Sequence, residues 1–402
     1  MATTTDNTNN QISFDIPRSI KYFMYNLQLL PEAYTGAETN RLTLCYFCVS
    51  ALDLLGAIDK IPSKQHIIDW IYNLQIAPHN NSDNNKDNNN IEFWQHSGFI
   101  GGTFLGGDYF QANDTRSSRA ANENLHGHIA MTYTSIATLL ILGDDLSRVK
   151  RDAIKVSLSA LQDKQGKFVA TFAGSESDMR FVYCACVISV MLGFDNTVFD
   201  VDKALQFIMS CYNYDGGFGL LPGQESHGGA CYTAIASLVL LGKLDILTKK
   251  QKSKLARWCL RRQVYYYENN SMAEEGKVKN IEVEPAGMQG RCNKLPDTCY
   301  SFWIGGTLQM LGEEWLNMLN KNKLRNYLLK HTQHKRFGGF GKVPGAPPDI
   351  LHAYFGVCGI SLIGQDSQYV KPLNAKFGLA ADTVRRTNLR DTIFKSEYKK
   401  YA

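Results

Sequence analysis

The sequence lacks the features that would place the protein in a membrane, on a secretory route or on nucleic acid. No apolar run approaches the roughly 18 residues of a membrane-spanning helix, and the first ten residues are too polar for a signal peptide. The net charge is only +5, and no basic run is interleaved with aromatic residues. We expect no membrane span, no nucleic-acid partner and, from ten cysteines without a secretion signal, reduced thiols in a cytoplasmic protein.

Several common catalytic motifs are also missing. Walker and nucleophile-elbow motifs do not occur. Gly217-Phe218-Gly219 is followed by Pro222 where a dinucleotide-binding loop has its third glycine. Alternation of apolar and polar residues rarely exceeds four residues, so few strands are expected. These absences leave helices as the main elements of a 402-residue chain with 44% hydrophobic residues.

A repeat organises most of the chain. Five apolar, helix-like runs end in Leu-Gly or Ile-Gly, and successive closing glycines are 49, 50 or 52 residues apart, except for one interval of 70. These glycines are Gly143, Gly193, Gly242, Gly312 and Gly364. Before each run lies a Gly-rich turn, and before most of these turns lies an amphipathic pattern. A period of this length is typical of helical repeats.

The two helix types of each repeat predict an all-α fold with two layers. The amphipathic segments have one polar face and should lie outside, whereas the closing runs are apolar on nearly all sides and should lie inside. The amphipathic segments are 153–161, 201–211, 254–262 and 324–331. Alternation of outer and inner helices indicates a solenoid or a closed α–α barrel. In both, the inner helices begin at one rim, where free backbone N–H groups favour anions.

We expect residues 1–402 to form a single domain with its core at about 17–364. Residues 78–90 are rich in Asn and Asp and form a low-complexity insertion. Residues 265–286 account for the long interval and are expected to be an irregular surface insertion. Residues 365–402 form a polar C-terminal tail, which we expect to be partly ordered at most.

Ionisable residues recur near the beginning of the inner runs. Counted back from the closing glycine, they lie 12 to 15 residues before it in each repeat. They are His128, Arg180, His227, Asp297, Cys299 and His352. An equal register in stacked repeats places such residues on one shared rim.

Asp297, Cys299 and His352 form a candidate metal site. One carboxylate, one thiolate and one imidazole are three zinc ligands that leave a fourth position open, as catalytic zinc sites do. Taken alone, an Asp-x-Cys pattern with a distant histidine is a weak signal, and its spacing favours a capping aspartate, a core cysteine and a hydrogen-bonded histidine. The shared register favours the metal site.

A candidate anion site lies beside it. Arg291 and Lys294 precede the Asp-x-Cys motif, and Tyr300 and His227 lie near helix N-termini. Two cations, a phenol and an imidazole suit a phosphate or diphosphate, and a solvated basic loop is the alternative. The inner runs also offer an aromatic lining that would suit a long apolar ligand, although such residues are common in any core. These aromatic residues are Tyr183, Tyr232, Phe302, Trp303, Tyr354 and Phe355.

With these residues, the chain resembles the beta subunits of protein prenyltransferases, and within that family the type I geranylgeranyl enzymes. The resemblance runs from about Tyr22 to Gly364. The stretches that carry it are HIAMTY (128–133), ILGDDLSRV (141–149), DMRFVYCA (178–185), ESHGG (225–229), GRCNKLPDTCYSFW (290–303) and LHAYFG (351–356). It implies a barrel of inner and outer helices that works as a heterodimer with an alpha subunit.

The resemblance also implies an activity and its residues. It implies transfer of a geranylgeranyl group from geranylgeranyl diphosphate to the cysteine of proteins with a C-terminal CaaX sequence ending in Leu or Phe, such as Rho- and Rac-type small GTPases. One Zn²⁺ would be bound by Asp297, Cys299 and His352. The diphosphate would be bound by His227, Arg291, Lys294 and Tyr300. The lipid and peptide pocket would comprise Thr43, His128, Ala130, Arg180, Phe181, Tyr183, Trp303, Leu351 and Phe355.

Three positions distinguish the subfamilies. Farnesyltransferases carry a bulky Trp where Thr43 stands and a Tyr where Phe355 stands. They also carry an Asp that holds Mg²⁺ where Lys342 stands, so Mg²⁺ is expected to be dispensable and Lys342 is counted with the catalytic residues. The chain departs from the family at Cys292, where Pro is usual, and in the insertion at 265–286.

Three alternatives remain on the sequence alone. A farnesyltransferase beta subunit would share the zinc and diphosphate residues. A non-enzymatic helical-repeat protein would bind no metal. Another barrel enzyme, such as a class II terpene cyclase or a glycosidase, would need an acidic DxDD motif or paired carboxylates; Gly143-Asp144-Asp145-Leu146 lacks the outer Asp.

Overall fold

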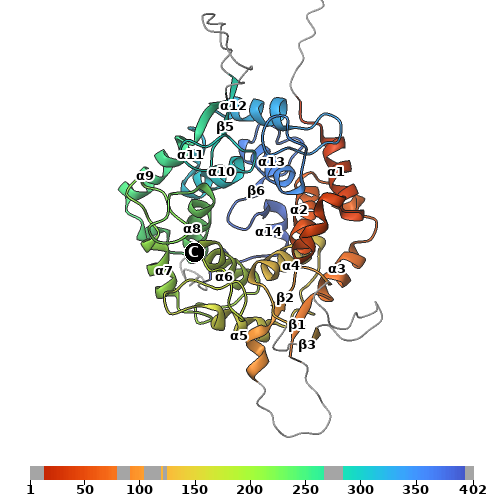
Figure 1. The fold of residues 1–402 in the computed structure, drawn as a ribbon, viewed down its shortest axis with the longest axis vertical. Coiled ribbons are helices and arrows are strands. Elements are labelled where there is room, and N and C mark those ends of the chain that lie inside the picture. The colour runs from red at the N-terminus through yellow and green to blue at the C-terminus, as the bar shows by residue number, and fades with distance from the viewer. Residues whose placement is uncertain (1–12, 79–90, 104–118, 121–124, 267–283, 394–402) are drawn as a thin grey trace, which may run out of the picture.

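A computed structural model describes residues 13–78, 91–103, 119–120, 125–266 and 284–393. Six inner helices form a closed ring, because each contacts the next and the last contacts the first (Figure 1). The inner helices are α2 (Arg41–Leu54), α4 (Ile129–Leu142), α6 (Met179–Met191), α8 (Gly228–Leu240), α10 (Tyr300–Leu311) and α13 (Ile350–Ile363). This ring confirms the closed α–α barrel and excludes the open solenoid.

Shorter helices surround the ring, as the amphipathic patterns predicted. They turn their apolar face inward and their charged face to water. They are α1 (Ile16–Gln28), α3 (Lys64–Tyr72), α5 (Arg151–Leu161), α7 (Val201–Ser210), α9 (Lys249–Leu260), α11 (Glu313–Leu316) and α12 (Lys321–Asn326), which continues as a π-helical turn over Tyr327–Thr332. Short 3₁₀ segments lie at Glu32–Asn40, Ile58–Lys60, Ile91–His96 and Leu244–Ile246. Among the helices that the structure describes, none combines the length and apolar character needed to cross a bilayer.

The closing glycines end the inner helices by their backbone conformation. Gly143 and Gly364 adopt φ values of 89° and 76°, in the left-handed region that favours glycine. Each donates its backbone N–H to a carbonyl of the last helical turn. The chain therefore leaves each inner helix sharply and returns to the outer layer within a few residues.

Strands β1 to β5 are short and lie outside the ring (Figure 1). Strand β1 (Gln75–Ala77) pairs with β2 (Gly98–Phe99) antiparallel and with β3 (Arg119–Ala120) parallel. Strands β4 (Gln263–Tyr266) and β5 (Glu284–Met288) form an antiparallel pair. The ends of the predicted insertion 265–286 are thus paired strands, and Ala286 is buried, so the expectation of an irregular surface segment is wrong there. Residues 267–283, like residues 79–90 of the Asn-rich insertion, lie outside the described residues.

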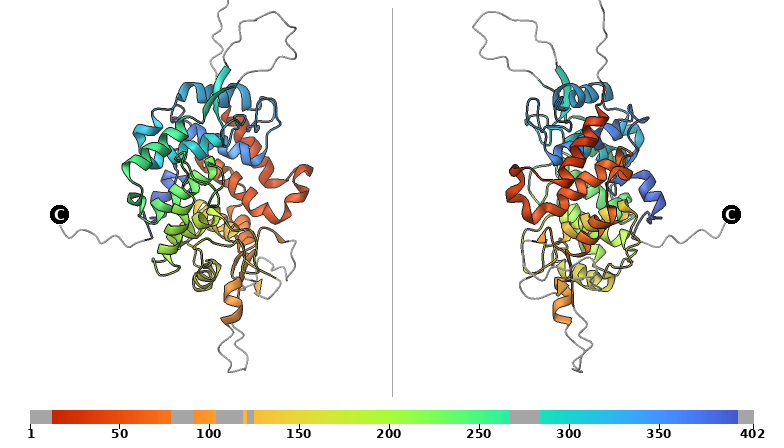
Figure 2. Two further views of the ribbon diagram at one scale, coloured as in Figure 1. Left: turned by 60° about the vertical axis from the view of Figure 1, so that its left-hand side comes forward. Right: turned by 90° about the vertical axis from the view of Figure 1, so that its right-hand side faces the viewer.

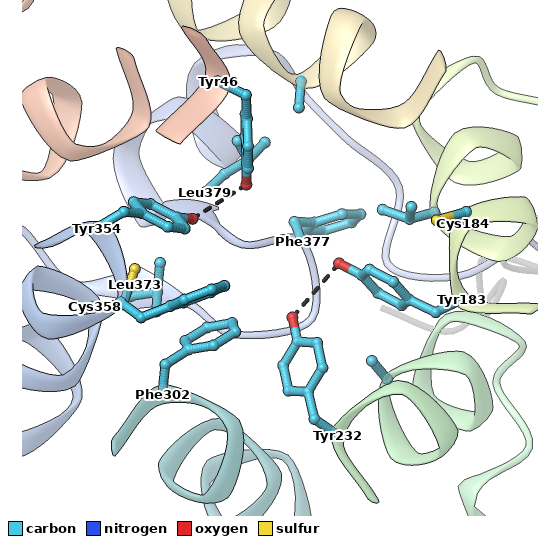
Figure 3. Close-up of a cluster of buried hydrophobic side chains, with 14 of the residues drawn as sticks. Tyr46, Tyr183, Cys184, Tyr232, Phe302, Tyr354, Cys358, Leu373, Phe377 and Leu379 are labelled. Carbon is cyan, nitrogen blue, oxygen red and sulfur yellow. Dashed lines mark hydrogen bonds between the residues drawn. The ribbon is translucent and has the colours of Figure 1, made fainter. Parts of the chain in front are cut away.

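The segment after Gly364 corrects a further expectation. Residues 365–393, here called the plug, were expected to be a tail of partial order at most, yet they enter the barrel (Figure 1). They contain strands β6 (Leu373–Asn374) and β7 (Leu379–Ala380), which pair antiparallel, and helix α14 (Ala381–Arg386). Side views show this C-terminal helix at one end of the barrel (Figure 2). Phe377 is fully buried at the centre of the ring (Figure 3).

Two sets of hydrogen bonds explain why a polar segment is ordered there. The plug satisfies carbonyl groups at the ends of inner helices: Arg386 donates to the carbonyls of Leu140 and Ile141, and the Lys371 backbone N–H donates to the Leu54 carbonyl. These are groups that a helix end leaves without intrahelical partners. The plug therefore covers the end of the barrel where the inner helices finish.

The second set comes from inside. Five phenol groups from five inner helices donate to the backbone carbonyls of residues 375–378 at 2.6–3.2 Å. These residues, here called the tyrosine ring, are Tyr46, Tyr133, Tyr183, Tyr232 and Tyr354 (most are labelled in Figure 3). Each lies ten residues before the glycine that follows its helix, and Phe302 has the same position in the sixth. One register thus supplies a donor from nearly every repeat.

We predict that the barrel depends on the plug for stability. Phe377→Ala should lower the free energy of unfolding by about 3–5 kcal/mol, because it leaves a large cavity in a close-packed interior. Tyr232→Phe should cost about 1–3 kcal/mol, since the buried Ala375 carbonyl loses its donor. Chemical denaturation of the purified protein, followed by circular dichroism, measures both.

The matched control is Tyr214→Phe, because Tyr214 is 95% exposed. It should change the free energy of unfolding by less than about 0.5 kcal/mol. Equal midpoints for the wild type and Phe377→Ala would show that the plug contributes nothing.

Candidate active site

Three residues with metal-binding side chains meet where α10 and α13 begin, at the end of the barrel opposite the plug. Cys299 is the N-cap residue of α10, and His352 lies in the first turn of α13. The Asp297 carboxylate accepts a hydrogen bond from the Cys299 backbone N–H at 2.9 Å. Thr298 donates from its hydroxyl to the Gly341 carbonyl at 2.6 Å. These bonds fix the approach to α10 and hold Asp297 and Cys299 against α13.

The donor atoms of Asp297, Cys299 and His352 all lie within 4.8 Å of one another. Asp297 Oδ1 is 3.3 Å from His352 Nε2. Donors bound tetrahedrally to one Zn²⁺ at about 2.0–2.3 Å lie about 3.3–3.6 Å from each other, so the three residues fit one ion after the donor atoms approach by about 1 Å. The donor types, one carboxylate, one thiolate and one imidazole, match a zinc site with an open position. The predicted cluster is therefore present as a geometric unit.

Burial and charge shape the protonation of this cluster. Burial, together with the nearby Asp297 carboxylate, holds the pKa of the Cys299 thiol well above its usual value. Burial alone would lower the pKa of His352, but its hydrogen bonds to Asp297 and Asp349 raise it to about 9. Burial would raise the pKa of Asp297, yet His352 and the Cys299 N–H bring it below the usual value. The cluster thus holds a thiol and an imidazole that both retain protons beside a carboxylate. A metal cation that binds all three groups would displace the protons of the thiol and the imidazole.

A histidine–tyrosine pair stands next to the metal cluster. His227 is the N-cap residue of α8, and its Nδ1 accepts the Gly229 backbone N–H at 3.1 Å. Its Nε2 must then carry the proton and donate to the Tyr300 hydroxyl at 2.9 Å. Burial and the charge of Arg291 lower the pKa of His227, which keeps the ring neutral. The hydrogen of the Tyr300 phenol is left available for another acceptor.

The loop before Asp297 is packed against this tyrosine. A Cβ atom on Gly290 would lie 2.0 Å from the Tyr300 ring, so a residue without a side chain is needed there. The Gly290 carbonyl accepts the Gly228 backbone N–H at 2.8 Å, which ties the loop to α8. The loop that carries Arg291 and Lys294 therefore has a fixed base beside Tyr300.

The predicted cations differ in how they are held. Arg291 forms an exposed ion pair with Glu225 at 3.3 Å, and the Lys294 backbone N–H donates to Gln289. Lys342 is 61% exposed and lies 3.9 Å from Asp297 Oδ2, next to the metal cluster. Arg180, in contrast, binds Asp178 and Glu176 with several short hydrogen bonds. The structure thus brings Lys342 to the cluster and leaves the charge of Arg180 neutralised within its own segment.

The residues of the predicted lipid and peptide pocket fall into three groups. Thr43 contacts Met131 on α4 at 3.3 Å, and the His128 and Phe181 rings lie edge to face, 6.0 Å apart, beside Ala130. Trp303 and Phe355 pack in an aromatic wall with ring centroids 4.6 Å apart, and Leu351 is half-exposed nearby on α13. Tyr183 belongs to the tyrosine ring and contacts the plug. These residues span the barrel from its rim to the plug.

Comparisons with known proteins place the chain. A family model described as the prenyltransferase alpha-alpha toroid domain matches residues 14–379. The beta subunit of geranylgeranyl transferase type 1 from Arabidopsis thaliana is 36% identical over 375 residues, which are 91% of this chain and 89% of that protein. The chain belongs to the protein prenyltransferase beta-subunit family. This result confirms the resemblance drawn from the sequence.

Two further relatives agree. The corresponding subunit of Dictyostelium discoideum is 35% identical to this prenyltransferase beta subunit over 349 residues, covering 85% of this chain and 88% of that protein. A solved structure of Candida albicans protein geranylgeranyltransferase-I complexed with GGPP superimposes with a TM-score of 0.73 at 27% identity, covering 94% of this chain and 98% of that chain. The chain therefore shares both sequence and fold with complete prenyltransferase beta subunits.

Sequence reasoning missed Asp349, which orients His352 of the candidate metal site in this prenyltransferase beta subunit. The Asp349 carboxylate accepts from His352 Nδ1 at 2.6 Å and, as the N-cap of α13, from the His352 backbone N–H at 2.9 Å. The first bond fixes the ring so that Nε2 faces Asp297 and Cys299, a common arrangement around metal sites. An aspartate three residues before the histidine at a helix start was the signal in the sequence.

We predict that Asp349→Ser weakens zinc binding about 10- to 100-fold. Serine also caps helices, so α13 should persist while His352 loses its carboxylate partner. Competition with a chromophoric chelator measures the affinity. The control is Asp200→Ser, which changes the N-cap of α7 far along the chain from the metal residues and should leave zinc affinity unchanged. If Asp349→Ser bound zinc as tightly as Asp200→Ser, Asp349 would have no role in zinc binding.

Proposed function

We propose that the chain is the catalytic beta subunit of a zinc-dependent protein geranylgeranyltransferase type I. It transfers a geranylgeranyl group from geranylgeranyl diphosphate to the cysteine of proteins that end in a CaaX sequence with Leu or Phe last. The product is a thioether. An alpha subunit completes the enzyme, and Rho- and Rac-type small GTPases are the expected substrates.

One observation supports the proposal above the others. The Asp297–Cys299–His352 cluster and the His227–Tyr300 pair lie side by side at the rim of an aromatic-lined barrel. A thiol nucleophile, a diphosphate leaving group and a long apolar chain each need one of these three environments. The family relationship with type 1 geranylgeranyl transferase subunits agrees with this combination.

The residues of the chain account for the chemistry. A zinc ion bound by Asp297, Cys299 and His352 would let the substrate cysteine bind as a thiolate near neutral pH. The sulfur forms a bond to C1 of the lipid while the bond from C1 to the diphosphate oxygen breaks. Negative charge then grows on the diphosphate, where the free phenol hydrogen of Tyr300 can donate to it.

The cations of the rim complete the diphosphate site. Arg291 and Lys294 extend from the loop that is fixed against Tyr300, and Lys342 lies beside the metal cluster. A lysine ammonium supplies at that position the positive charge that a divalent cation supplies elsewhere. We therefore propose that the reaction proceeds without Mg²⁺.

Selectivity for the longer lipid follows from small side chains in the wall. Thr43 on α2 faces Met131 on α4 across the seam between two inner helices. A Trp at position 43 would project into the interior and shorten the space for the lipid chain. Phe355 on α13 and Trp303 on α10 continue the apolar wall.

We predict that Thr43→Trp shifts the preference from geranylgeranyl to farnesyl diphosphate, changing the ratio of the two kcat/KM values by about 10- to 200-fold. Thr43→Ser is the matched control, since it keeps a small hydroxyl residue and should keep the selectivity. Steady-state kinetics with both diphosphates give the ratio. A ratio that is the same in Thr43→Trp and the wild type would exclude Thr43 as the length-determining residue.

The experiment that tests the function uses the chain co-expressed with a prenyltransferase alpha subunit. A peptide ending in CaaL is offered with geranylgeranyl or farnesyl diphosphate, with and without Mg²⁺, and bound zinc is quantified on the same sample. We expect one zinc per heterodimer and geranylgeranyl transfer that does not need Mg²⁺. Lys342→Asp should make the rate depend on Mg²⁺.

Other outcomes would support other functions. Farnesyl transfer that requires Mg²⁺ would make the protein a farnesyltransferase subunit. Absence of both zinc and transfer would favour a non-enzymatic helical-repeat protein.

A further inference from the structure

Cys292 differs from every other cysteine of the chain in its surroundings. Of the ten cysteines, eight are buried, Cys45 is half-buried and Cys292 is exposed. Burial raises the pKa of most of the buried thiols, for example that of Cys186 to about 12, so these thiols stay protonated and unreactive. Cys292 is thus the thiol that a solute can reach.

The sulfur of Cys292 is also in contact with a buried cation. Arg262 is only 6% exposed, and its Nη1 donates to Cys292 Sγ at 2.7 Å. Its guanidinium lies over the Trp258 ring at 4.7 Å, and its Nε has no hydrogen-bond partner. Within the described ranges, no carboxylate lies within 4.0 Å of this guanidinium. A buried arginine without a counter-ion is unusual, and here it faces a thiol.

The contact lies inside the loop that carries the diphosphate residues. Cys292 stands between Arg291 and Lys294, and Asn293 next to it turns the chain with a φ of 58°. Arg262 is bound to the same loop a second time, because its carbonyl accepts the Gln289 backbone N–H at 2.8 Å. A chemical change at the Cys292 sulfur therefore affects the loop that carries Arg291 and Lys294.

We propose that Cys292 is a site of reversible oxidation by hydrogen peroxide, and that its oxidation weakens diphosphate binding. The Cys292 thiolate attacks one peroxide oxygen; a sulfur–oxygen bond forms, the oxygen–oxygen bond breaks, and the released hydroxide takes a proton to become water. Sulfur is oxidised by two electrons and the peroxide is reduced. The new oxygen is an acceptor for the Arg262 guanidinium, whose Nε is without a hydrogen-bond partner.

The consequence for the reaction rests on the proposed function. An additional oxygen does not fit into a nitrogen–sulfur contact of 2.7 Å, so the loop must move away from Arg262. Arg291 and Lys294 then lose their positions beside Tyr300. Displacements of about 1 Å in a positioning group commonly cost up to about 10²-fold, so we expect KM for geranylgeranyl diphosphate to rise at least about tenfold.

The test treats the full chain, co-expressed with an alpha subunit, with hydrogen peroxide and then with a dimedone probe that labels sulfenic acids. Peptide mass spectrometry should find the label at Cys292 and at least about tenfold less at Cys45, whose thiol is shielded. The variant Cys292→Ser should show no label in that peptide. Arg262→Lys, which keeps the charge but shortens the fork of donors, should lower the labelling of Cys292. Absence of label at Cys292 in the wild type would overturn the proposal.

Kinetics on the same samples test the consequence. Peroxide should raise KM of the wild type, a thiol reductant should restore it, and Cys292→Ser should keep its KM throughout. Bound zinc is measured in parallel, because loss of zinc would indicate oxidation of Cys299 instead. An equal loss of activity in Cys292→Ser would overturn the proposed effect on diphosphate binding. If the reduced enzyme showed no transfer, the proposed function would fail, whereas the labelling result would still decide on Cys292.

Discussion

The hydrogen bonds from the tyrosine ring to the plug hold the interior of this barrel together. Backbone carbonyls inside an apolar cavity are costly unless donors reach them. Here five donors come from five separate helices, so the plug fits only when all five have the correct register. That register is set by the glycines that end the helices, such as Gly143 and Gly364. The ionisable groups lie 12 to 15 residues before the same glycines, which places them toward the other end of the barrel. The same repeat therefore positions both the tyrosine ring in the interior and the residues of the candidate active site.

At the rim, side chains that cap helices also hold the residues of the proposed site. His227 accepts a backbone N–H of α8 through Nδ1, which assigns the proton to Nε2 and directs it to Tyr300. Asp349 caps α13 with one oxygen and binds the ring of His352 with the other. In both cases the helix start fixes the orientation of a functional ring without further residues. A substitution at such a position alters the local fold and the chemistry together, which is why a variant that keeps the cap is the informative one.

The repeat, the two helix layers and the cluster of Asp297, Cys299 and His352 could be predicted from the sequence. Periodic burial of the helices and a shared register of the ionisable residues both leave a periodic pattern in the sequence. The sequence was misleading for residues 365–393, because the expectation of a partly ordered tail was based on their polar composition. Their backbone is bound by five tyrosines, four of which lie more than a hundred residues away along the chain. Hydropathy contains no information on that pairing. The tyrosines themselves recur ten residues before five of the six glycines that follow the inner helices, so the signal existed on the side of the donors. Asp349 was missed because a helix cap and a histidine partner look alike in sequence.

The distribution of satisfied and unsatisfied cations indicates which part of the rim receives the anion. Arg180 on α6 is bound by Asp178 and Glu176 at 2.7–3.1 Å, so an incoming anion would have to displace two carboxylates. Arg291 has one exposed partner at 3.3 Å, and the exposed Lys342 lies 3.9 Å from the buried Asp297. An exposed pair such as that of Arg291, and a long contact such as that of Lys342, contribute little stability and leave the cation free to bind a ligand. The positive charge that a ligand can recruit therefore lies along the starts of α8, α10 and α13, on the side of the metal cluster. In the proposed function, this asymmetry of partners, rather than the number of basic residues, would place the diphosphate on the side of the Asp297–Cys299–His352 cluster.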